Sequence, residues 1–333
     1  MREAMAGTAS NVLLFIDPPD HTRIRNLVSR SFTPKAVAGW RPRIEQVVDE
    51  LLDEAAERGR LEIISEYGFQ VPVIVICELL GVPTEDRDRF GPWSSDASRL
   101  LDGDIDQETM MRGAAGALQL INYLNPLIEE RRHHPHDDLL SRIVQSEENG
   151  ETLSEEELRS LTLLLFVAGH ETTMNLIGNG MKALLQHPDE LRRLRDDPSL
   201  ITTTVEEVLR FDGPVHVTGR IPTQDLEVSG QLFTKGSQVV TLLAAANRDP
   251  AEFPDPDRFD VSRQPNHHLA FSKGIHHCLG ASLARLESQI AIRKLVERFG
   301  DLELVTTEPH YRDHFVLRGL RELEVELGAP TQS

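Results

Sequence analysis

The strongest constraint on the fold is one long apolar segment with helical spacing, which runs from Ser154 to Gln186. Ser154 followed by Glu157 is a capping-box signature, so a helix is predicted to begin here. His187 and the proline after it end the pattern. At 1.5 Å per residue, this helix would be roughly 50 Å long. A helix of that length would cross a whole domain.

The rest of the chain divides into a helical part and a smaller part with β character. Apolar patterns predict further helices at 36–57, 69–80, 122–132, 137–147 and 279–299. Short runs between Gly and Pro turns predict strands at 215–218, 226–228, 238–242, 302–305 and 323–327, with a long loop at 246–266. We therefore predict a mainly α fold with a smaller β portion, in a single domain over residues 1–333. Its helix-rich parts are 17–211 and 279–299, and its parts rich in strands and loops are 212–278 and 300–327.

Charge and cysteine content exclude several classes of protein. The chain has 35 Lys and Arg residues against 54 Asp and Glu, a net charge of −19. Such an acidic surface repels phosphate backbones and is not drawn to anionic membranes, so we expect no nucleic acid partner. The two cysteines, Cys77 and Cys278, are too few for a disulfide framework, which fits a reducing cytosol. We expect no apolar run long enough to cross a bilayer, and a cytoplasmic protein without a membrane anchor.

The second cysteine lies in a segment that favours metal binding. Residues 271–280 have the sequence F-S-K-G-I-H-H-C-L-G, in which Gly274 and Gly280 let the backbone turn sharply beside a flat ligand. Cys278 directly precedes a predicted helix, whose free N–H groups favour a thiolate. A thiolate is a good ligand for a soft metal centre. Without these neighbours, a cysteine would more often be a small buried apolar side chain.

The long helix has a weak point at its middle. Residues 168–173 have the sequence A-G-H-E-T-T, and glycine and adjacent threonines are poor helix formers. A threonine hydroxyl there can bond to a backbone carbonyl of the preceding turn. Taken alone, this segment would be a helix with a packing glycine and a solvated acid.

These motifs together resemble a known family. The pattern F-x-x-G-x-H-x-C-L-G is similar to the haem-binding loop of the cytochrome P-450 monooxygenases, and three further motifs occur in that family's order between 17 and about 327. The resemblance implies a cytochrome P-450-like helical fold around haem b, with the thiolate of Cys278 as the axial ligand. It also implies that Phe271, Gly274 and Gly280 shape the cofactor-binding loop.

The resemblance gives the weak point of the long helix a role in oxygen activation. Ala168 and Gly169 are implied to lie beside the haem, where the small glycine leaves room for dioxygen. The cleavage of dioxygen consumes two protons. The hydroxyl of Thr172 is implied to hold a hydrogen bond there, and the carboxylate of Glu171 to relay protons from solvent. His170 is expected to face away.

The resemblance also assigns four side chains to the two haem propionates. His21 and Arg25 lie four residues apart on a helix that is expected to begin at the D-P-P-D sequence of residues 17–20. Arg220 is implied to reach the propionates from a strand, and His276 from the cysteine loop. Arginine in particular binds a carboxylate through two parallel hydrogen bonds.

A fourth motif is implied to be structural. Glu207 and Arg210 are three apart and share one helix face. In the family this pair is joined by an arginine from a P-x-R-F loop, which here is Arg258. We expect the three side chains to fix the long loop to the helix.

Activity and partners also follow from the resemblance. It implies a monooxygenase that oxidises a small lipophilic substrate with dioxygen. Electrons would come from NAD(P)H through a ferredoxin-like or flavodoxin-like donor and its reductase, with Lys273 and Arg285 as candidate contacts for the donor. Two alternatives stay open: a peroxide-driven enzyme that needs no redox partner, and a haem-binding remnant without turnover.

The chain departs from the family's pattern in two places. Family members carry several dozen residues upstream of the motif at residue 17, so we expect an N-terminally truncated chain with an open pocket. Ser272 stands where the family often has glycine, and we expect it to be tolerated. The histidines outside the motifs are expected to be solvated loop residues and not metal ligands: His133, His134, His136, His267 and His268.

Overall fold

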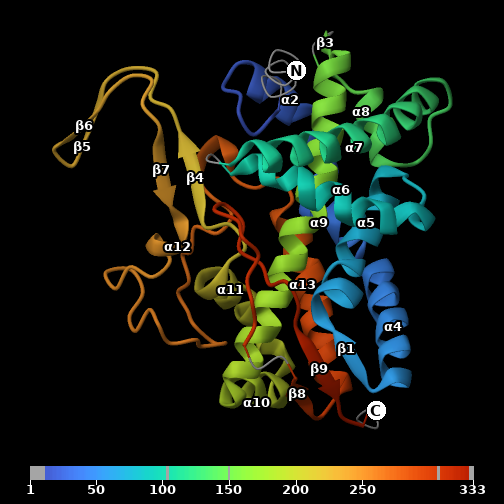
Figure 1. The fold of residues 1–333 in the computed structure, drawn as a ribbon, viewed down its shortest axis with the longest axis vertical. Helices are drawn as coiled ribbons and strands as arrows, with labels where there is room; N and C mark the ends of the chain where they lie inside the picture. Colours follow the sequence, from blue (N-terminus) through green and yellow to red (C-terminus); the bar gives the residue numbers. More distant parts are fainter. Residues whose placement is uncertain (1–11, 103–104, 149–150, 306–307, 330–333) are drawn as a thin grey trace.

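The computed structural model describes residues 12–102, 105–148, 151–305 and 308–329. Its central element is the predicted long helix, α9 (Glu155–Gln186), which runs through the molecule in Figure 1. Ser154 and Glu157 form both bonds of the predicted capping box, and His187 ends the helix. The helices that pack on it include α5 (Gln70–Leu80), α11 (Ile201–Asp212) and α13 (Ala281–Arg298). The mainly helical fold predicted from the sequence is confirmed.

The remaining helices surround this centre. They are α2 (Asp20–Ser29), α3 (Pro34–Ala38), α4 (Arg41–Arg58), α6 (Arg87–Ser98), α7 (Gln107–His133), α8 (Leu139–Val144), α10 (Pro188–Asp196) and α12 (Leu243–Ala246). The predicted helix 36–57 is therefore two helices, and the predicted helix 122–132 is only the end of α7. Gly113 and Gly116 are poor helix formers, so the first half of α7 was not predicted from the sequence. Each stands where α6 packs so closely that a side chain would clash with it or with the turn that follows it.

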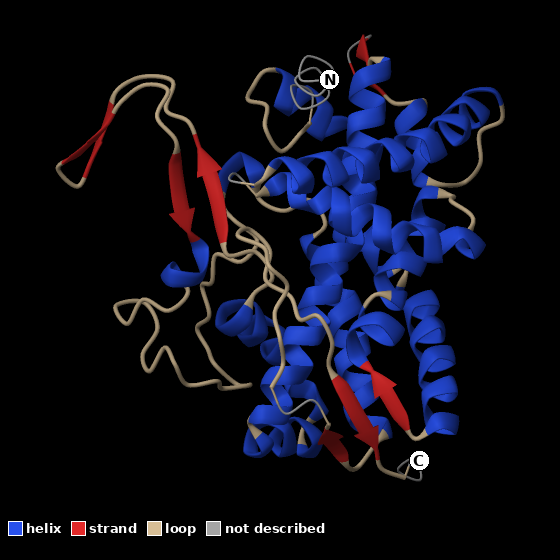
Figure 2. Ribbon diagram, viewed as in Figure 1, coloured by secondary structure: helices blue, strands red, loops and turns tan. Residues whose placement is uncertain are grey.

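Small antiparallel sheets make up the β portion. The largest joins β1 (Arg60–Glu62), β9 (Glu324–Leu327) and β8 (Leu302–Leu304), with Val325 opposite both Leu61 and Leu304. The other pairs are β2 (Glu147–Glu148) with β3 (Glu151–Thr152), β4 (Val217–Arg220) with β7 (Val239–Leu242), and β5 (Leu226–Val228) with β6 (Gln231–Phe233). Figure 2 shows the last two pairs projecting to one side of the helices. Four of the strands named here are absent from the sequence prediction: β1, β2, β3 and β6.

One apolar stretch departs from the expectation that none is long enough to cross a bilayer. Ile63–Leu80 has the length and composition of a membrane span. However, 67% of it is buried inside the structure, and it packs against α9. Burial on this scale is typical of a core helix, as was predicted for 69–80.

Candidate active site

Cys278 lies in the turn that leads into α13. Its backbone N–H donates to the carbonyl of Phe271 at 3.0 Å and so closes the loop. Gly274 has a φ of 76°, in the left-handed region that glycine adopts without steric cost. Ser272 also has a positive φ, 58°, which explains why glycine suits this position. Gly280 is the N-cap of α13 and places the sulfur at the start of that helix.

The two cysteines have different surroundings. Cys278 is exposed, whereas Cys77 is buried in the core. Surrounding protein atoms raise the pKa of the Cys278 thiol, and this effect outweighs the N–H of Gly280 and the guanidinium groups of Arg25 and Arg285, which lower it. Burial raises the pKa of Cys77 to about 12, so this thiol stays protonated. Of the two, only Cys278 is placed to bind a ligand or a metal.

Helix α2 brings two predicted site residues against the cysteine loop. The rings of His21 and His276 meet edge to face, with their centroids 4.6 Å apart, and Arg25 Nη2 donates to the carbonyl of His277. His21 is buried, yet neither ring nitrogen has a hydrogen-bond partner in the described part of the chain. Burial and the nearby Arg25 lower the pKa of His21. A buried imidazole in this condition is rare in proteins, and it is able to bond to a water or to a polar ligand.

Arg220 lies at the end of β4 and is exposed. Its Nη1 donates to the hydroxyl of Thr218 and the carbonyl of Gly219, both at 2.7 Å. Burial lowers the pKa of His276, and the charges of His21 and Arg220 lower it further. The four side chains that the sequence assigned to the propionates, from α2, β4 and the loop, are therefore close neighbours.

The middle of α9 has one exposed face. Ala168 is exposed although it lies near the centre of a 32-residue helix, and Thr172 is partly exposed one turn later. The Thr172 hydroxyl donates to the Ala168 carbonyl at 2.9 Å, as predicted for a threonine here. Gly169 also has a packing role that was not predicted. A Cβ at Gly169 would lie 2.9 Å from the Cδ1 atom of Ile76, so this glycine lets α5 pack on α9. That Gly169 leaves room for dioxygen stays a prediction.

Glu171 has a partner that the sequence did not reveal. Its carboxylate is buried and forms an ion pair with Arg312, which lies 141 residues further along the chain. No motif marks Arg312, so this contact could not be predicted from local patterns. The neighbouring His170 faces away, as expected, with its ring nitrogens 2.8 Å from the Ser94 hydroxyl and the Phe166 carbonyl.

A second buried acid connects α13 to the same part of α9. Glu287 is 1% exposed and accepts a hydrogen bond from Thr173, the residue next to Thr172. Burial raises the pKa of Glu287 to about 8, although that hydrogen bond lowers it. Glu287 lies six residues into α13, which is about 9 Å from the helix start. The Cys278 loop and the exposed face of α9 are therefore close in space.

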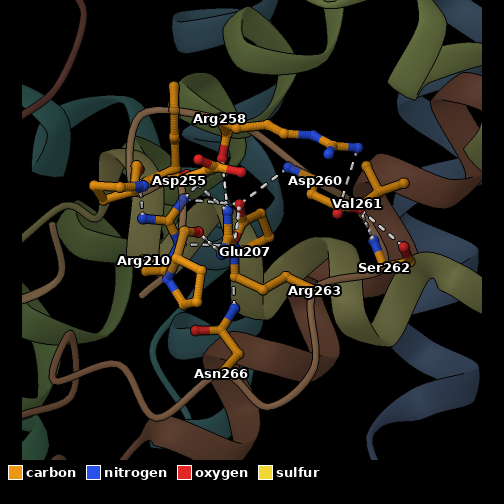
Figure 3. Close-up of polar contacts among 12 residues, drawn as sticks. Glu207, Arg210, Asp255, Arg258, Asp260, Val261, Ser262, Arg263 and Asn266 are labelled. Atoms are coloured by element: carbon orange, nitrogen blue, oxygen red, sulfur yellow. Dashed lines mark hydrogen bonds and ion pairs between the residues drawn. The ribbon is translucent and has the colours of Figure 1, made fainter. Parts of the chain in front are cut away.

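The structural triad has a different third member from the one predicted. Glu207 and Arg210 form a fully buried pair with N–O distances of 2.8 Å. Arg263, not Arg258, completes it, with Nε 3.1 Å from Glu207 Oε1. The Arg258 side chain is 60% exposed and points away, as Figure 3 shows, so only its backbone carbonyl bonds to Arg210 and Arg263. The P-x-R-F pattern led to the wrong arginine because Arg263 lies five residues further along the same loop.

His268 also differs from its prediction as a solvated residue. Its side chain is 4% exposed and its Nε2 lies 2.9 Å from a carboxylate oxygen of Glu206. Glu206, the residue next to Glu207, thus binds the segment that leads into the cysteine loop.

Comparison with known proteins agrees with this geometry. The family description "Cytochrome P450" matches residues 104–321, more than half of the chain. The biotin biosynthesis cytochrome P450 of Bacillus subtilis is 42% identical over 316 residues, which are 95% of this chain and 80% of that protein. The vitamin D(3) 25-hydroxylase of Pseudonocardia autotrophica is 45% identical over 331 residues, or 98% of this chain and 80% of that protein.

A solved structure shows the same fold. The crystal structure of P450BioI in complex with an acyl carrier protein ligated to hexadec-9Z-enoic acid superposes with a TM-score of 0.93 at 41% identity. The match covers 97% of this chain and 83% of that one. The long central helix, the glycine-flanked cysteine loop and these relatives lead to one conclusion: the chain belongs to the cytochrome P450 family of haem-containing monooxygenases.

Proposed function

We propose that Cys278 supplies the thiolate ligand of the haem and that the chain oxidises a small lipophilic substrate with dioxygen. The observation that carries this proposal is the setting of Cys278. Its sulfur is exposed at the start of α13, beside the Gly280 N–H and near two arginines, whereas the other cysteine is buried and protonated. Haem, when bound, supplies the iron at which dioxygen is reduced.

The described residues fit this cofactor. His21 is buried without a partner among the described residues, and Arg25 and Arg220 lie close enough to His276 to lower its pKa. These donors suit two propionate carboxylates. The apolar side chain of Ile275, within the loop, is 48% exposed and suits a flat porphyrin. Phe271, Gly274 and Gly280 would hold the loop that carries the sulfur.

Two residues on α9 would manage protons. Among the described residues, Thr172 Oγ1 donates to a carbonyl of its own helix, and its lone pairs remain able to accept a hydrogen bond at the site. Glu171 is paired with Arg312, and its carboxyl group would pass protons from solvent toward the site. The presence of both residues favours use of dioxygen over use of peroxide, because a peroxide-driven reaction does not need them.

Substrate and partners are inferred by chemical class. Relatives include a vitamin D(3) 25-hydroxylase, a 6-deoxyerythronolide B hydroxylase and an enzyme bound to a carrier-linked fatty acid. All three names denote lipophilic molecules, so we propose a small lipophilic substrate here. We propose a cytoplasmic enzyme that receives electrons from NAD(P)H through a ferredoxin-like or flavodoxin-like donor and its reductase.

Turnover by the purified, haem-loaded protein tests this function. It would be given NADPH, a reductase, a ferredoxin and a panel of lipophilic compounds. NADPH oxidation coupled to an oxygenated product is the expected result. Product formed only with hydrogen peroxide would replace this proposal with the peroxide-driven alternative. A normal haem spectrum with no product from either oxidant would indicate a remnant without turnover.

A further inference from the structure

Glu206 joins three elements around the cysteine loop. It lies on α11 next to the triad residue Glu207, and its carboxylate accepts two hydrogen bonds from Arg285 of α13. The Arg285 Nε–Oε1 distance is 2.6 Å and the Nη2–Oε2 distance is 2.9 Å. The Nε2 atom of His268, on the segment that enters the loop, lies 2.9 Å from Oε2. One carboxylate therefore ties the helix after the loop to the segment before it.

Arg285 also contacts the loop itself. Its guanidinium carbon lies 4.5 Å from the centre of the Phe271 ring, a distance typical of a cation–π contact. The Phe271 carbonyl in turn accepts the Cys278 N–H at 3.0 Å. A chain of direct contacts thus runs from Glu206 through Arg285 and Phe271 to the backbone of Cys278.

The pair is built to hold Arg285 in one orientation. A planar guanidinium with two parallel bonds to a carboxylate is fixed in direction as well as in position. Burial opposes ionisation of Glu206, but bonds from His268 and Arg285 outweigh it and lower the pKa of that carboxyl to about 2. Glu206 is therefore charged at neutral pH. These contacts also give Arg285 a role other than the contact with an electron donor that the sequence suggested.

We propose that Glu206 and Arg285 form one positioning unit, which orients Phe271 and thereby fixes the Cys278 backbone and the surroundings of its sulfur. This inference rests on the proposed role of Cys278 as the haem ligand. It assigns the pair a function in keeping the thiolate bound to iron and in setting the reduction potential of the haem. Neither residue touches the reacting atoms.

Three variants of the haem-loaded protein test the proposal: Glu206→Gln, Arg285→Lys and the double variant. Arg285→Lys keeps the charge but loses the fork and the flat surface that stacks on Phe271. Lys294→Gln is the matched control, because Lys294 forms an exposed ion pair with Asp49 further along the same helix. For each protein we would measure the CO spectrum of the reduced haem, the reduction potential and the urea midpoint.

We expect both single variants to increase the non-thiolate CO form several-fold and to shift the potential in the same direction. The double variant should be no worse than either single variant, because the two residues act as one unit. The control should match the wild type. A wild-type spectrum and reduction potential in Arg285→Lys would overturn the proposal. Potential shifts of opposite sign in the two single variants that add in the double variant would also overturn it, because they indicate an effect of charge alone. If the wild-type protein itself lacks the thiolate-type band, the assignment of Cys278 fails first.

Discussion

Thr172 and Glu171 are adjacent in the sequence but lie in different surroundings. Successive residues of a helix point in different directions, so Thr172 is on the exposed face of α9 while Glu171 is buried against Arg312. The alcohol can meet a substrate or a water directly. The Glu171 carboxylate can reach the site only if its ion pair with Arg312 rearranges. Under the proposed function, proton transfer would therefore have one step at Thr172 Oγ1 and another at the Glu171 carboxylate.

Replacement of Thr172 by alanine tests the first step. Haem binding should persist, but product formed per NADPH should fall by roughly tenfold or more, with peroxide released in its place, because no hydroxyl holds the proton. Product and peroxide would be measured together with NADPH oxidation. Thr162→Ala is a matched control. Thr162 makes the same bond to a carbonyl four residues back in α9, about 15 Å away along the helix. Unchanged coupling in Thr172→Ala would contradict the role of this hydroxyl.

Glu287 predicts how stability depends on pH. Its pKa is raised to about 8 from 4.5 in the unfolded chain. Between these values the folded protein keeps a proton that the unfolded chain has lost, so stability falls as pH rises through this window. Glu287→Gln removes this dependence. The difference in free energy of unfolding between this variant and the wild type should increase in favour of the variant by roughly 3–5 kcal/mol from pH 4.5 to pH 8.

Urea unfolding at several pH values between these limits measures that difference. Glu297→Gln, at an exposed position on the same helix, should follow the wild type throughout. Parallel curves for Glu287→Gln and the wild type would show that the buried carboxyl does not hold its proton.

At the scale of elements, two adjacent glutamates of α11 hold the chain on either side of the cysteine loop. Glu207 is fully buried and binds Arg210, Arg263 and the backbone N–H of Asp260. Glu206 binds the loop's two flanks through Arg285 and His268. A short helix thus orders a loop that has little regular structure of its own, because buried charges must be paired.

Arg263 and Arg258 lie on the same loop, so the effects of replacing them can be compared directly. Arg263→Ala leaves the buried Glu207 short of a partner and should lower the free energy of unfolding by about 3 kcal/mol. Arg258→Ala removes an exposed side chain that lies 3.7 Å from Asp260 and should change it by about 0.5 kcal/mol or less. Urea unfolding of both variants measures the two changes in free energy of unfolding. Equal losses would mean that the buried triad does not distinguish the two arginines.

The loop itself carries one residue in an unfavourable conformation. Ser272 has a φ of 58°, which is costly for any residue with a Cβ. Ser272→Gly should therefore raise the free energy of unfolding by roughly 0.5–1 kcal/mol. The urea midpoint measures this gain. A loss of stability would show that the serine makes a contribution that outweighs its backbone strain.

At the scale of the whole molecule, the sequence predicted the parts that local patterns determine. The capping box of α9, the turn at Gly274 and the E-x-x-R pair are local, and each has the predicted conformation or contact. Contacts between distant segments were missed. Arg312 with Glu171 and Glu287 with Thr173 depend on how helices pack, which no spacing within one segment reveals. That residues 1–333 form one domain stays a prediction.

The most direct test of the account is the absorption spectrum of the reduced, haem-loaded protein with carbon monoxide, compared between the wild type and Cys278→Ala. The account predicts the strongly red-shifted band of thiolate-ligated haem in the wild type, and its loss in the variant. Cys77→Ala should keep the band, since Cys77 is buried and protonated. A thiolate-type band that survives in Cys278→Ala, or that is absent from the wild type, would contradict the assignment of Cys278 as the ligand.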